Sequence, residues 1–505
     1  MRTHFTYEPA ATAGSADAIV RLISSAELKA GSMAEWVQPQ IDEAVRGLYA
    51  KGLFKAEPEQ TETLSTLGLH SASHVIFAGY DDKTGVHGLR LAAAAAANAL
   101  KKIKAQTAQI RLPEAIMTSA DYTVQQAAQA LVEGLTLAVH DRIPELRQAK
   151  QRYALSHVSF VPAAGAAVPA DMAETWNEGM MVGQLYAEGV KVARDLTNLP
   201  GNQLVPESLA AHAEELAREW DLDIEVLDEW AAIEQGMGGL LAVGQGSVHA
   251  PRMIVIHYKG APDKEEAWGL IGKGITFDTG GISLKKGPGM EEMISDMGGA
   301  AAVLGAMRVI GELKPDVNVI AVIPTAENMP SAQAFKPGDV IKMMNGLTVE
   351  IVNTDAEGRL VLGDGLTTAI RRGATQLVDV ATLTGAVMVA LGTEATGAIT
   401  NNEPLMQQVF EAAGRSGERI WQLPAYPEYK RQLRSDAADL KNSGGRYAGA
   451  TTGGLFIGAF AEDLPWVHLD IAGTAFLDKS RGLEPKGATG VMVRTLVELV
   501  TKNEG

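Results

Sequence analysis

The sequence predicts an α/β protein built from two domains. Strand-like apolar runs alternate with helix-like segments along the chain, as where residues 73–79 precede a helical pattern over 89–103. Alternation of this kind predicts sheets covered by helices. The chain has 505 residues, more than the roughly 250–300 at which a single hydrophobic core stops growing. Two domains are therefore expected.

The clearest candidate for a domain boundary is the alanine- and proline-rich segment 161–170. Its composition is typical of a linker. A long helix is expected after it, with Asp171 as its N-cap and a stop signal at Asn198-Leu199-Pro200-Gly201. The predicted organisation is an N-terminal α/β domain over 1–165, a linker and connecting helix over 166–200, and a second domain over 201–505.

Composition and charge narrow the classes of protein that fit. With 46% hydrophobic and 21% charged residues, the chain has the composition of an ordinary globular protein. It has no cysteine, which excludes disulfides and thiolate metal sites and fits a reducing cytoplasm. The 44 basic and 61 acidic residues give a net charge of −17, which repels nucleic acid and anionic membranes. No signal-peptide pattern is found, and no stretch approaches the roughly 20 apolar residues of a membrane span. A cytoplasmic protein without membrane or nucleic-acid partners is expected.

The segment 353–360, Asn-Thr-Asp-Ala-Glu-Gly-Arg-Leu, is the strongest candidate for a functional site. It lies between a strand-like run, 349–352, and a helix-like run. If this loop is extended, Asp355, Glu357 and Arg359 face one space, because side chains two residues apart then point the same way. Two carboxylates aimed at one point raise each other's pKa unless a cation lies between them, and a hard divalent metal is the natural cation. The alternative is that the carboxylates only cap the following helix.

Two further polar clusters favour the metal site over helix capping. One, 272–285, follows the apolar run 268–271; the other, 291–299, places Asp296 at the start of a helix of small residues. In open α/β sheets, sites form where such loops gather beyond the carboxyl ends of the strands. Other predicted strands also lead into polar or glycine-rich loops that would wall the site: 317–323, 376–381 and 466–471.

The segment 353–360, together with the spacing of Lys273, Asp278, Lys285 and Asp296, resembles the leucine aminopeptidase family of two-metal cytosolic exopeptidases. The resemblance covers roughly residues 190–495 and is loose in the N-terminal third. It implies an N-terminal domain that resembles a macrodomain. It also implies a C-terminal catalytic domain with three α/β/α layers around a central mixed sheet, as in zinc peptidases.

The resemblance implies two divalent metal ions per chain, Mn²⁺ or Zn²⁺, with Mg²⁺ as a further candidate. Lys273, Asp278, Asp296 and Glu357 correspond to the ligands of the tighter ion. Asp278, Asp355 and Glu357 correspond to those of the more exchangeable ion. A lysine ligand has to be the neutral amine, because an ammonium group beside a dication is strongly disfavoured.

The resemblance also implies two catalytic residues. Lys285 stays charged and binds the oxyanion that develops on the scissile carbonyl. Arg359 holds a bicarbonate ion that acts as general base, which suits the bidentate grip of a guanidinium; the alternative is a salt bridge between Arg359 and Glu357. The implied activity is that of a leucyl aminopeptidase, a hydrolase that uses a hydroxide shared by two metals to remove leucine or another apolar residue from a free peptide N-terminus.

Substrate contacts and assembly follow from the same resemblance. The family assembles as a homohexamer, and its substrates are peptides with a free N-terminus. Two other roles are weighed: a DNA-binding regulator, which the acidic balance disfavours, and a catalytically silent scaffold, which the complete ligand set disfavours. The residues expected to contact substrate are Met293, Asn328, Thr382, Gly385 and Ala475.

Overall fold

The computed structural model describes residues 2–8, 16–30, 36–142, 153–162 and 171–501. The chain divides into two compact units: Met1–Ala187 with Lys479–Pro485, and Glu188–Asp478 with Lys486–Gly505. The predicted connecting helix is α6 (Met172–Thr197), and the division between the units falls within it. Residues 163–170 of the predicted linker lie outside the described residues, whereas Val161 and Pro162 end strand β6.

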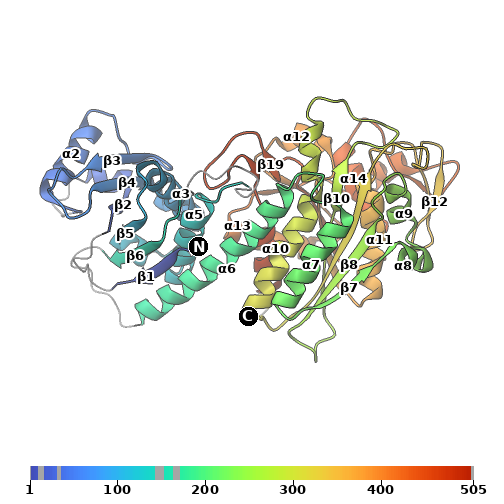
Figure 1. Cartoon of the computed structure of the whole chain (residues 1–505), viewed down its shortest axis with the longest axis horizontal. Coiled ribbons are helices and arrows are strands. Elements are labelled where there is room, and N and C mark those ends of the chain that lie inside the picture. The colour runs from blue at the N-terminus through green and yellow to red at the C-terminus, as the bar shows by residue number, and fades with distance from the viewer. Residues whose placement is uncertain (1, 9–15, 31–35, 143–152, 163–170, 502–505) are drawn as a thin grey trace. The chain divides into compact units, whose positions relative to one another are not determined.

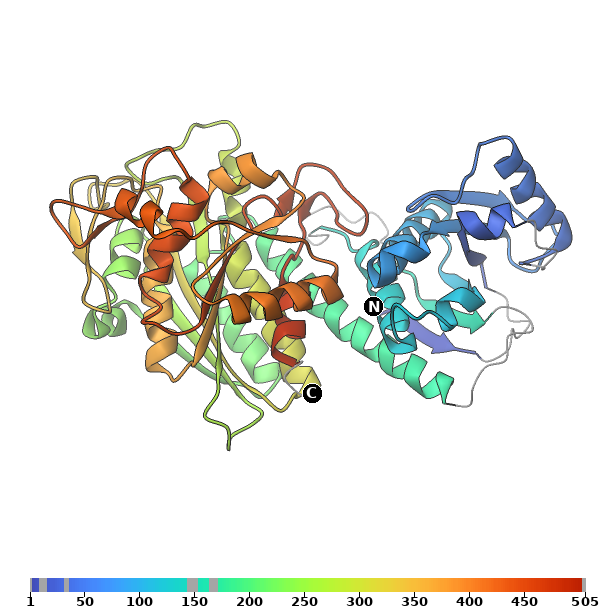
Figure 2. The same cartoon turned by 180° about the vertical axis from the view of Figure 1, so that it is seen from behind.

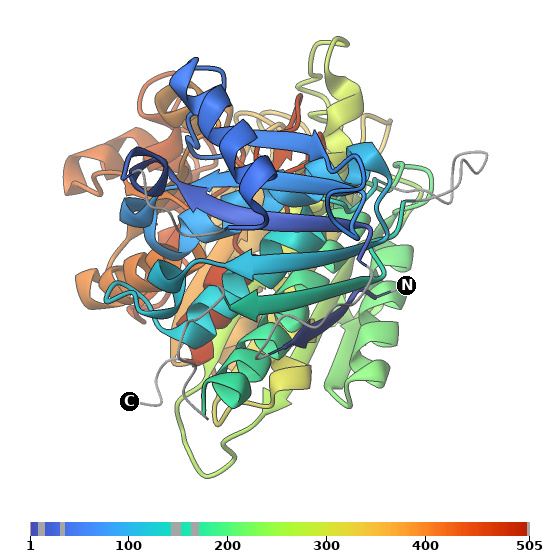
Figure 3. The same cartoon turned by 90° about the vertical axis from the view of Figure 1, so that its left-hand side faces the viewer.

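The first unit contains a six-stranded sheet, which faces the viewer in Figure 3. All neighbouring strands are parallel except β3, which pairs antiparallel with β4. Helices α3 (Gly85–Ile103) and α5 (Val124–Leu137) pack on one face together with Trp176 of α6, and α2 (Pro39–Ala50) packs on the other. The strand order is β1 (His4–Tyr7), β6 (His157–Pro162), β5 (Thr107–Leu112), β2 (Ala18–Ser24), β4 (His74–Tyr80) and β3 (Thr61–Ser65).

The second unit is built on a mixed sheet, as predicted, and this sheet has nine strands. Its four central strands, β18, β14, β9 and β11, run parallel, and β15 and β8 pair antiparallel at either side of them. The order is β16 (Ile420–Gln422), β15 (Thr396–Thr400), β18 (Trp466–Asp470), β14 (Gln376–Ala381), β9 (Trp268–Gly272), β11 (Asn318–Asn328), β8 (Arg252–Lys259) and β7 (Asp223–Leu227), while β10 (Gly274–Asp278) pairs with β11. The strands predicted at 268–271, 317–323, 376–381 and 466–471 are thus confirmed as β9, β11, β14 and β18.

Helices cover both faces of this sheet and give the predicted three layers (Figures 1 and 2). Consecutive strand residues point to opposite faces. At Gly272, a Cβ would lie 2.7 Å from Cα of Ala300 in α10 (Gly298–Leu313). Its neighbour Ile271 instead contacts α11 (Gly358–Arg371), where a Cβ on Gly365 would lie 3.0 Å from Cγ2 of Ile271. The other helices of this unit are α7 (Pro206–Glu219), α8 (Glu229–Gln235), α9 (Gly238–Gly244), α12 (Gly385–Leu391), α13 (Glu403–Ser416), α14 (Gly449–Gly458) and α15 (Val493–Thr501).

Two sequence predictions need correction. One stretch, Met290–Leu313, is long and apolar enough to cross a membrane, contrary to the expectation that none is. In the structure it is a 3₁₀ segment (Met290–Met297) followed by α10, and 89% of its apolar window is buried, which is the pattern of a core helix. The strand predicted at 349–352 is shorter: β13 (Thr348–Glu350) lies outside the main sheet, in a small sheet with β12 (Val340–Lys342) and β17 (Leu440–Lys441).

Candidate metal centre

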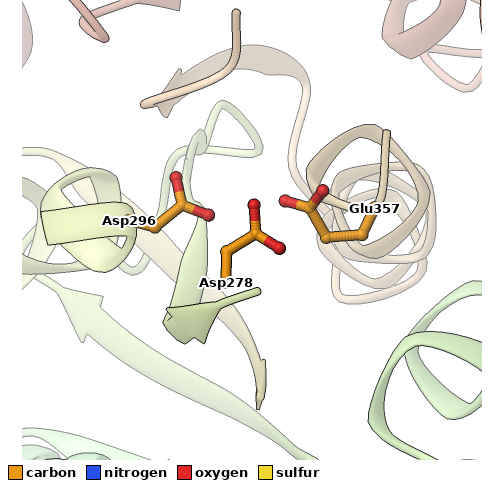
Figure 4. A group of neighbouring side chains, drawn as sticks. All are labelled: Asp278, Asp296 and Glu357. Atoms are coloured by element: carbon orange, nitrogen blue, oxygen red, sulfur yellow. The ribbon is translucent and has the colours of Figure 1, made fainter. Parts of the chain in front are cut away.

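The candidate site forms where parallel strands of the main sheet end. Lys273 follows β9, and Asp278 is the last residue of β10. Asp296 lies in the 3₁₀ segment before α10, and Glu357 is the N-cap of α11. These elements gather at the carboxyl edge of the sheet, the place where α/β folds form sites. Figure 4 shows the side chains of Asp278, Asp296 and Glu357 pointing toward one another from these three elements.

The loop that carries Asp355 and Glu357 is not extended, so the geometric reason given for their convergence was wrong. Thr354 and Asp355 form a turn, in which the backbone N–H of Asp355 donates to Oδ1 of Asn353 at 3.0 Å. This is the local hydrogen bond by which asparagine favours turns. Glu357 then opens the helix, and Arg359 lies in its first turn. The side chains of Asp355, Glu357 and Arg359 are therefore brought together by a turn followed by the start of a helix.

The three carboxylates nearest the centre are buried and close together. Asp278, Asp296 and Glu357 each offer an oxygen that lies within 4.8 Å of the others. Nζ of Lys273 lies 2.8 Å from Oδ2 of Asp296 and 2.9 Å from Oε1 of Glu357. A Cβ at Gly358 would come within 2.5 Å of Cε of Lys273. The glycine after Glu357 is therefore required for the close approach of the lysine.

A second lysine binds the other side of the cluster. Nζ of Lys285 lies 2.7 Å from Oδ2 of Asp278 and also contacts Oδ1 of Asp355. Its side chain is 25% exposed, whereas that of Lys273 is 3% exposed. All five predicted metal ligands and Lys285 thus belong to one continuous cluster.

Burial and mutual repulsion set the protonation of these groups. Burial raises the pKa of Asp278, and the neighbouring Glu357 carboxylate raises it further. Burial also raises the pKa of Asp296 well above its ordinary value, and that of Asp355. Burial alone would lower the pKa of both lysines, but the carboxylates outweigh it and raise the pKa of each above its ordinary value. Both lysines are therefore cationic in this structure.

The donor set fits divalent cations. Four carboxyl groups face two ammonium groups, so the oxygen donors outnumber the positive charges in the cluster. Oδ2 of Asp296 and Oδ1 of Asp355 are buried, and although each lies near an ammonium nitrogen, neither accepts a well-directed hydrogen bond from the described residues. Oxygen donors with one amine suit Mn²⁺, Zn²⁺ or Mg²⁺.

Arg359 lies beside the carboxylates with a free donor. It is buried, and Nη1 donates to the carbonyl of Asn442 at 2.8 Å. Nε is buried without a hydrogen-bond partner among the described residues. Burial lowers the pKa of Arg359, although the charges of Glu357 and Asp470 oppose this. No ion pair between Arg359 and Glu357 is found in the described part of the chain, so the guanidinium keeps a donor that could bind a small anion.

The residues expected to contact substrate occupy different positions. Asn328 is fully buried and donates to Oδ1 of Asp278 at 2.8 Å, so it orients this carboxylate. Thr382 holds two of the charged side chains: its carbonyl accepts from Nζ of Lys273, and its hydroxyl donates to Oδ1 of Asp296, each at 2.8 Å. A Cβ at Gly298 would lie 3.6 Å from the methyl group of Thr382 and 3.5 Å from Cβ of Ala475, which places those two side by side. The other two expected substrate contacts are known only by position. Met293 is half-buried in the 3₁₀ segment, and Gly385 is the first residue of α12, with open space where a Cβ would be.

Sequence reasoning missed residues that hold the site from a distance. Asp470, at the end of β18, accepts hydrogen bonds from the backbone of Leu383 and the hydroxyl of Thr384, and so fixes the loop of Thr382. Asn442 binds the segment 352–356. Both lie more than 80 residues from the groups they hold. The one sequence signal was the position of Asp470 near the end of the predicted strand 466–471; no predicted strand pointed to Asn442.

Fold and site together define an α/β protein with a carboxylate-rich centre for divalent cations at the edge of its sheet. Comparison with protein-family models makes this specific. Residues 191–497 match the catalytic domain of the cytosol aminopeptidase family, and residues 19–143 match its N-terminal domain. The chain belongs to this family, and it is a metal-dependent aminopeptidase, a peptidase among the hydrolases.

Two individual relatives match most of the chain, and a third matches about two thirds of it. A probable cytosol aminopeptidase of Alkaliphilus metalliredigens (strain QYMF) is 44% identical over 89% of each chain. That of Alkaliphilus oremlandii (strain OhILAs) is 41% identical over 97% of each, and that of Bacillus subtilis (strain 168) is 56% identical over 64% of this chain and 65% of its own. Among solved structures, the bottromycin maturation enzyme BotP in complex with Mn has a TM-score of 0.82 at 33% identity, covering 97% of this chain and 100% of that one. Neither a DNA-binding role nor a silent scaffold finds support in these relatives.

Proposed function

We propose that this aminopeptidase removes leucine and other apolar residues from the free N-terminus of peptides, with two divalent cations bound in each chain. The observation that carries the proposal is the division of the cluster by its lysines. Lys273 contacts Asp296 and Glu357, and Lys285 contacts Asp278 and Asp355. The carboxylates therefore face two neighbouring cationic groups, and Asp278 and Glu357 lie close enough to each other to be shared between two cations bound side by side.

The residues have separable tasks in this reaction. Bound cations supply Lewis acidity toward the scissile carbonyl and lower the pKa of a water molecule. Lys273, Asp278, Asp296 and Glu357 form the set for one cation, and Asp278, Asp355 and Glu357 form the set for the other. Asn328 and Thr382 hold the carboxylates of Asp278 and Asp296.

Lys285 and Arg359 are the proposed catalytic residues. Lys285 is partly exposed and cationic, so it can donate to the oxyanion that develops on the substrate carbonyl. Arg359 offers its free Nε–H to bicarbonate, a planar anion that can accept a proton as general base. Oxyanion binding by Lys285 and bicarbonate binding by Arg359 both need a side chain that stays positively charged during the reaction.

Substrate preference follows from the small side chains near Asp296. The methyl group of Thr382 and Ala475 meet at Gly298, and open space lies beside Gly385. A surface of this kind favours an apolar side chain over a charged one. It distinguishes apolar residues weakly, since one methylene changes selectivity by about 1–3 kcal/mol. Contacts of Met293 and Asn328 with substrate are part of the same proposal.

We further propose a cytoplasmic homohexamer. The relatives at 41–56% identity are named cytosol aminopeptidases, and the chain has no cysteine, as is common in a reducing compartment.

Hydrolysis of leucine p-nitroanilide tests the proposed function. Protein stripped with a chelator should be inactive and should regain activity when Mn²⁺ or Zn²⁺ is returned. The N-acetylated substrate is the matched control and should not be cleaved, because it offers no free amine. Equal cleavage of both substrates, or activity that survives complete removal of metal, would overturn the proposal.

A further inference from the structure

Asn442 binds the ligand-bearing loop with both ends of its side-chain amide. It follows β17 directly and is fully buried. Its Nδ2 donates to the carbonyl of Asn353 at 2.6 Å and to that of Ala356 at 3.3 Å. Its Oδ1 accepts from the backbone N–H of Val352 at 2.9 Å and of Asn353 at 3.3 Å. The bound backbone groups lie on both sides of Asp355.

The backbone of the same residue adds two further contacts. Its N–H donates to the carbonyl of Glu350 at 3.0 Å, which continues the pairing of β13 with β17 by one residue. Its carbonyl accepts from Nη1 of Arg359 at 2.8 Å. One residue thus contacts the chain before Asp355, the chain after it, and the side chain of Arg359.

The chemistry of an amide explains why asparagine occupies this position. Between β13 and α11 the chain forms no regular ladder, so its buried backbone groups need other partners. A primary amide supplies two N–H donors and two acceptor lone pairs in one plane. Aspartate has nearly the same shape, but it would place a carboxylate against two carbonyl oxygens.

We propose that Asn442 is a positioning residue that fixes Asp355 and Arg359 relative to the rest of the centre. The consequence for catalysis rests on the cleavage of peptides in the proposed function, whereas the consequence for metal binding rests only on its two cations. Asp296 and Lys273 lie on other elements and have no contact with Asn442 among its described hydrogen bonds. Loss of the amide should therefore weaken the cation held by Asp355 more than the cation held by Lys273 and Asp296.

The test compares Asn442→Ala and Asn442→Asp with a matched control, Asp439→Ala. Asp439 lies three residues earlier in the same segment and also bridges to the β13 region, accepting from the N–H and the hydroxyl of Thr348 at 2.8 and 2.7 Å. It is exposed, and its hydrogen bonds among the described residues do not involve the loop 352–356. Binding of Mn²⁺ to the metal-free proteins is measured by equilibrium dialysis, and kcat and KM for leucine p-nitroanilide are measured on the reconstituted proteins.

Both Asn442 variants should bind the first Mn²⁺ with little change and the second about 10- to 100-fold more weakly, as is typical when a partner that orients a ligand is removed. Their kcat should fall at saturating Mn²⁺ because the segment that carries Asp355 loses the side-chain amide that holds it, while Asp439→Ala should match the wild type. If Asn442→Ala does not fold, Asn442→Asp decides, since it keeps the volume and both acceptor bonds.

Two results would overturn the proposal: two Mn²⁺ bound with wild-type affinity and an unchanged kcat, or failure of both variants to fold, which would make Asn442 a general framework residue. Failure of the proposed function is distinguishable. In that case the wild type itself would not cleave the substrate with any metal, while the difference in Mn²⁺ affinity between the variants and the control would persist.

Discussion

The two lysines of the carboxylate cluster differ in burial, and this difference suits them to different roles. Lys273 is almost fully buried between Asp296 and Glu357, whereas Lys285 keeps a quarter of its side chain exposed. A buried amine among carboxylates can exchange its proton for a metal ion. A partly exposed ammonium can reach a substrate. The same residue type is thus suited to ligation in one place and to oxyanion binding in the other.

Metal binding should release protons and should therefore be stronger at higher pH. The carboxylates raise the pKa of Lys273 above its ordinary value, so its amine is protonated in the metal-free protein at neutral pH. A cation that takes this amine as ligand has to displace the proton. The affinity for Mn²⁺ should rise from pH 6 to pH 8 by up to about tenfold per unit for each proton released.

Calorimetric titration in two buffers of different ionisation enthalpy counts the released protons. Lys273→Met, which keeps the length of the side chain but has no proton to release, should bind Mn²⁺ more weakly and with a smaller dependence on pH. An affinity independent of pH in the wild type would contradict the assignment of Lys273 as a ligand.

Asp364 in α11 gives a prediction about stability. It is fully buried, and its two oxygens accept from the backbone N–H groups of Leu240 and Met344, each at 2.9 Å. Burial raises its pKa to about 7. Between its ordinary pKa near 4 and this value, the folded state holds a proton that the unfolded chain has released. The contribution of Asp364 to the free energy of unfolding therefore decreases as pH rises through this range.

Replacing Asp364 with Asn should lower the free energy of unfolding by about 1–3 kcal/mol, because one buried N–H loses its acceptor. The difference in melting temperature between the wild type and Asp364→Asn should be larger at pH 5 than at pH 8. The same difference at pH 5 and pH 8 would show that the carboxylate is ionised throughout and would contradict the raised pKa.

At the residue scale, the sequence predicted the groups that carry charge and missed those that hold them. Lys273, Asp278, Asp296, Asp355 and Glu357 could be named because a compact motif and fixed spacings carry them, and the structure brings them together. The part played by Asn442 depends on a fold that brings two segments about 90 residues apart into contact. A single sequence has no periodicity or spacing that reports such a contact.

At the scale of elements, two loops meet through a reciprocal pair of hydroxyl residues. The hydroxyl of Thr354 donates to the carbonyl of Gly280 at 2.6 Å and accepts from the N–H of Ser283 at 2.8 Å. The hydroxyl of Ser283 in turn accepts from the N–H of Thr354 at 3.1 Å. These bonds tie the loop that carries Asp355 to the loop that carries Lys285.

Thr354→Val should disconnect the two loops while keeping the shape of the side chain. The variant should lose about 1–3 kcal/mol of stability, because buried backbone groups are left unsatisfied, and its kcat should fall as Lys285 loses its place. The control is Thr367→Val in α11, whose buried hydroxyl bonds only the carbonyl of Gly363 within the same helix. Equal kcat values for the two variants, measured on leucine p-nitroanilide, would argue against coupling between the loops.

Elements were predicted well where a strand is buried and apolar. The four central strands were recognised from largely apolar runs that lead into polar or glycine-rich loops, and such runs are typical of parallel strands covered on both faces. The loop between β13 and α11 was not, because its shape is set by hydrogen bonds from Asn353 and Asn442 rather than by a pattern of apolar residues. The apolar stretch Met290–Leu313 likewise could not be judged before its burial was known.

At the scale of the whole molecule, the residues of the proposed metal centre all lie in one of the two units. Every residue of the proposed centre belongs to the unit formed by Glu188–Asp478 and Lys486–Gly505. The first unit has its own sheet and core, with a buried ion pair in which Nε of Arg90 lies 2.6 Å from Oε2 of Glu133.

The proposed hexamer predicts a particle of six chains. Each chain has a mass of 53.4 kDa, so light scattering coupled to size exclusion should give a mass close to six times that value. Sedimentation at several protein concentrations shows whether the particle dissociates. A monomer at all concentrations would contradict the proposal, and activity of that monomer would show that one chain suffices for catalysis.

The most direct test of the metal centre is an anomalous-diffraction map from crystals loaded with Mn²⁺. Two peaks per chain are predicted: one contacted by Lys273, Asp278, Asp296 and Glu357, and one contacted by Asp278, Asp355 and Glu357. Peaks confined to other parts of the chain, or a single peak that Asp355 does not contact under saturating Mn²⁺, would contradict the two-cation centre.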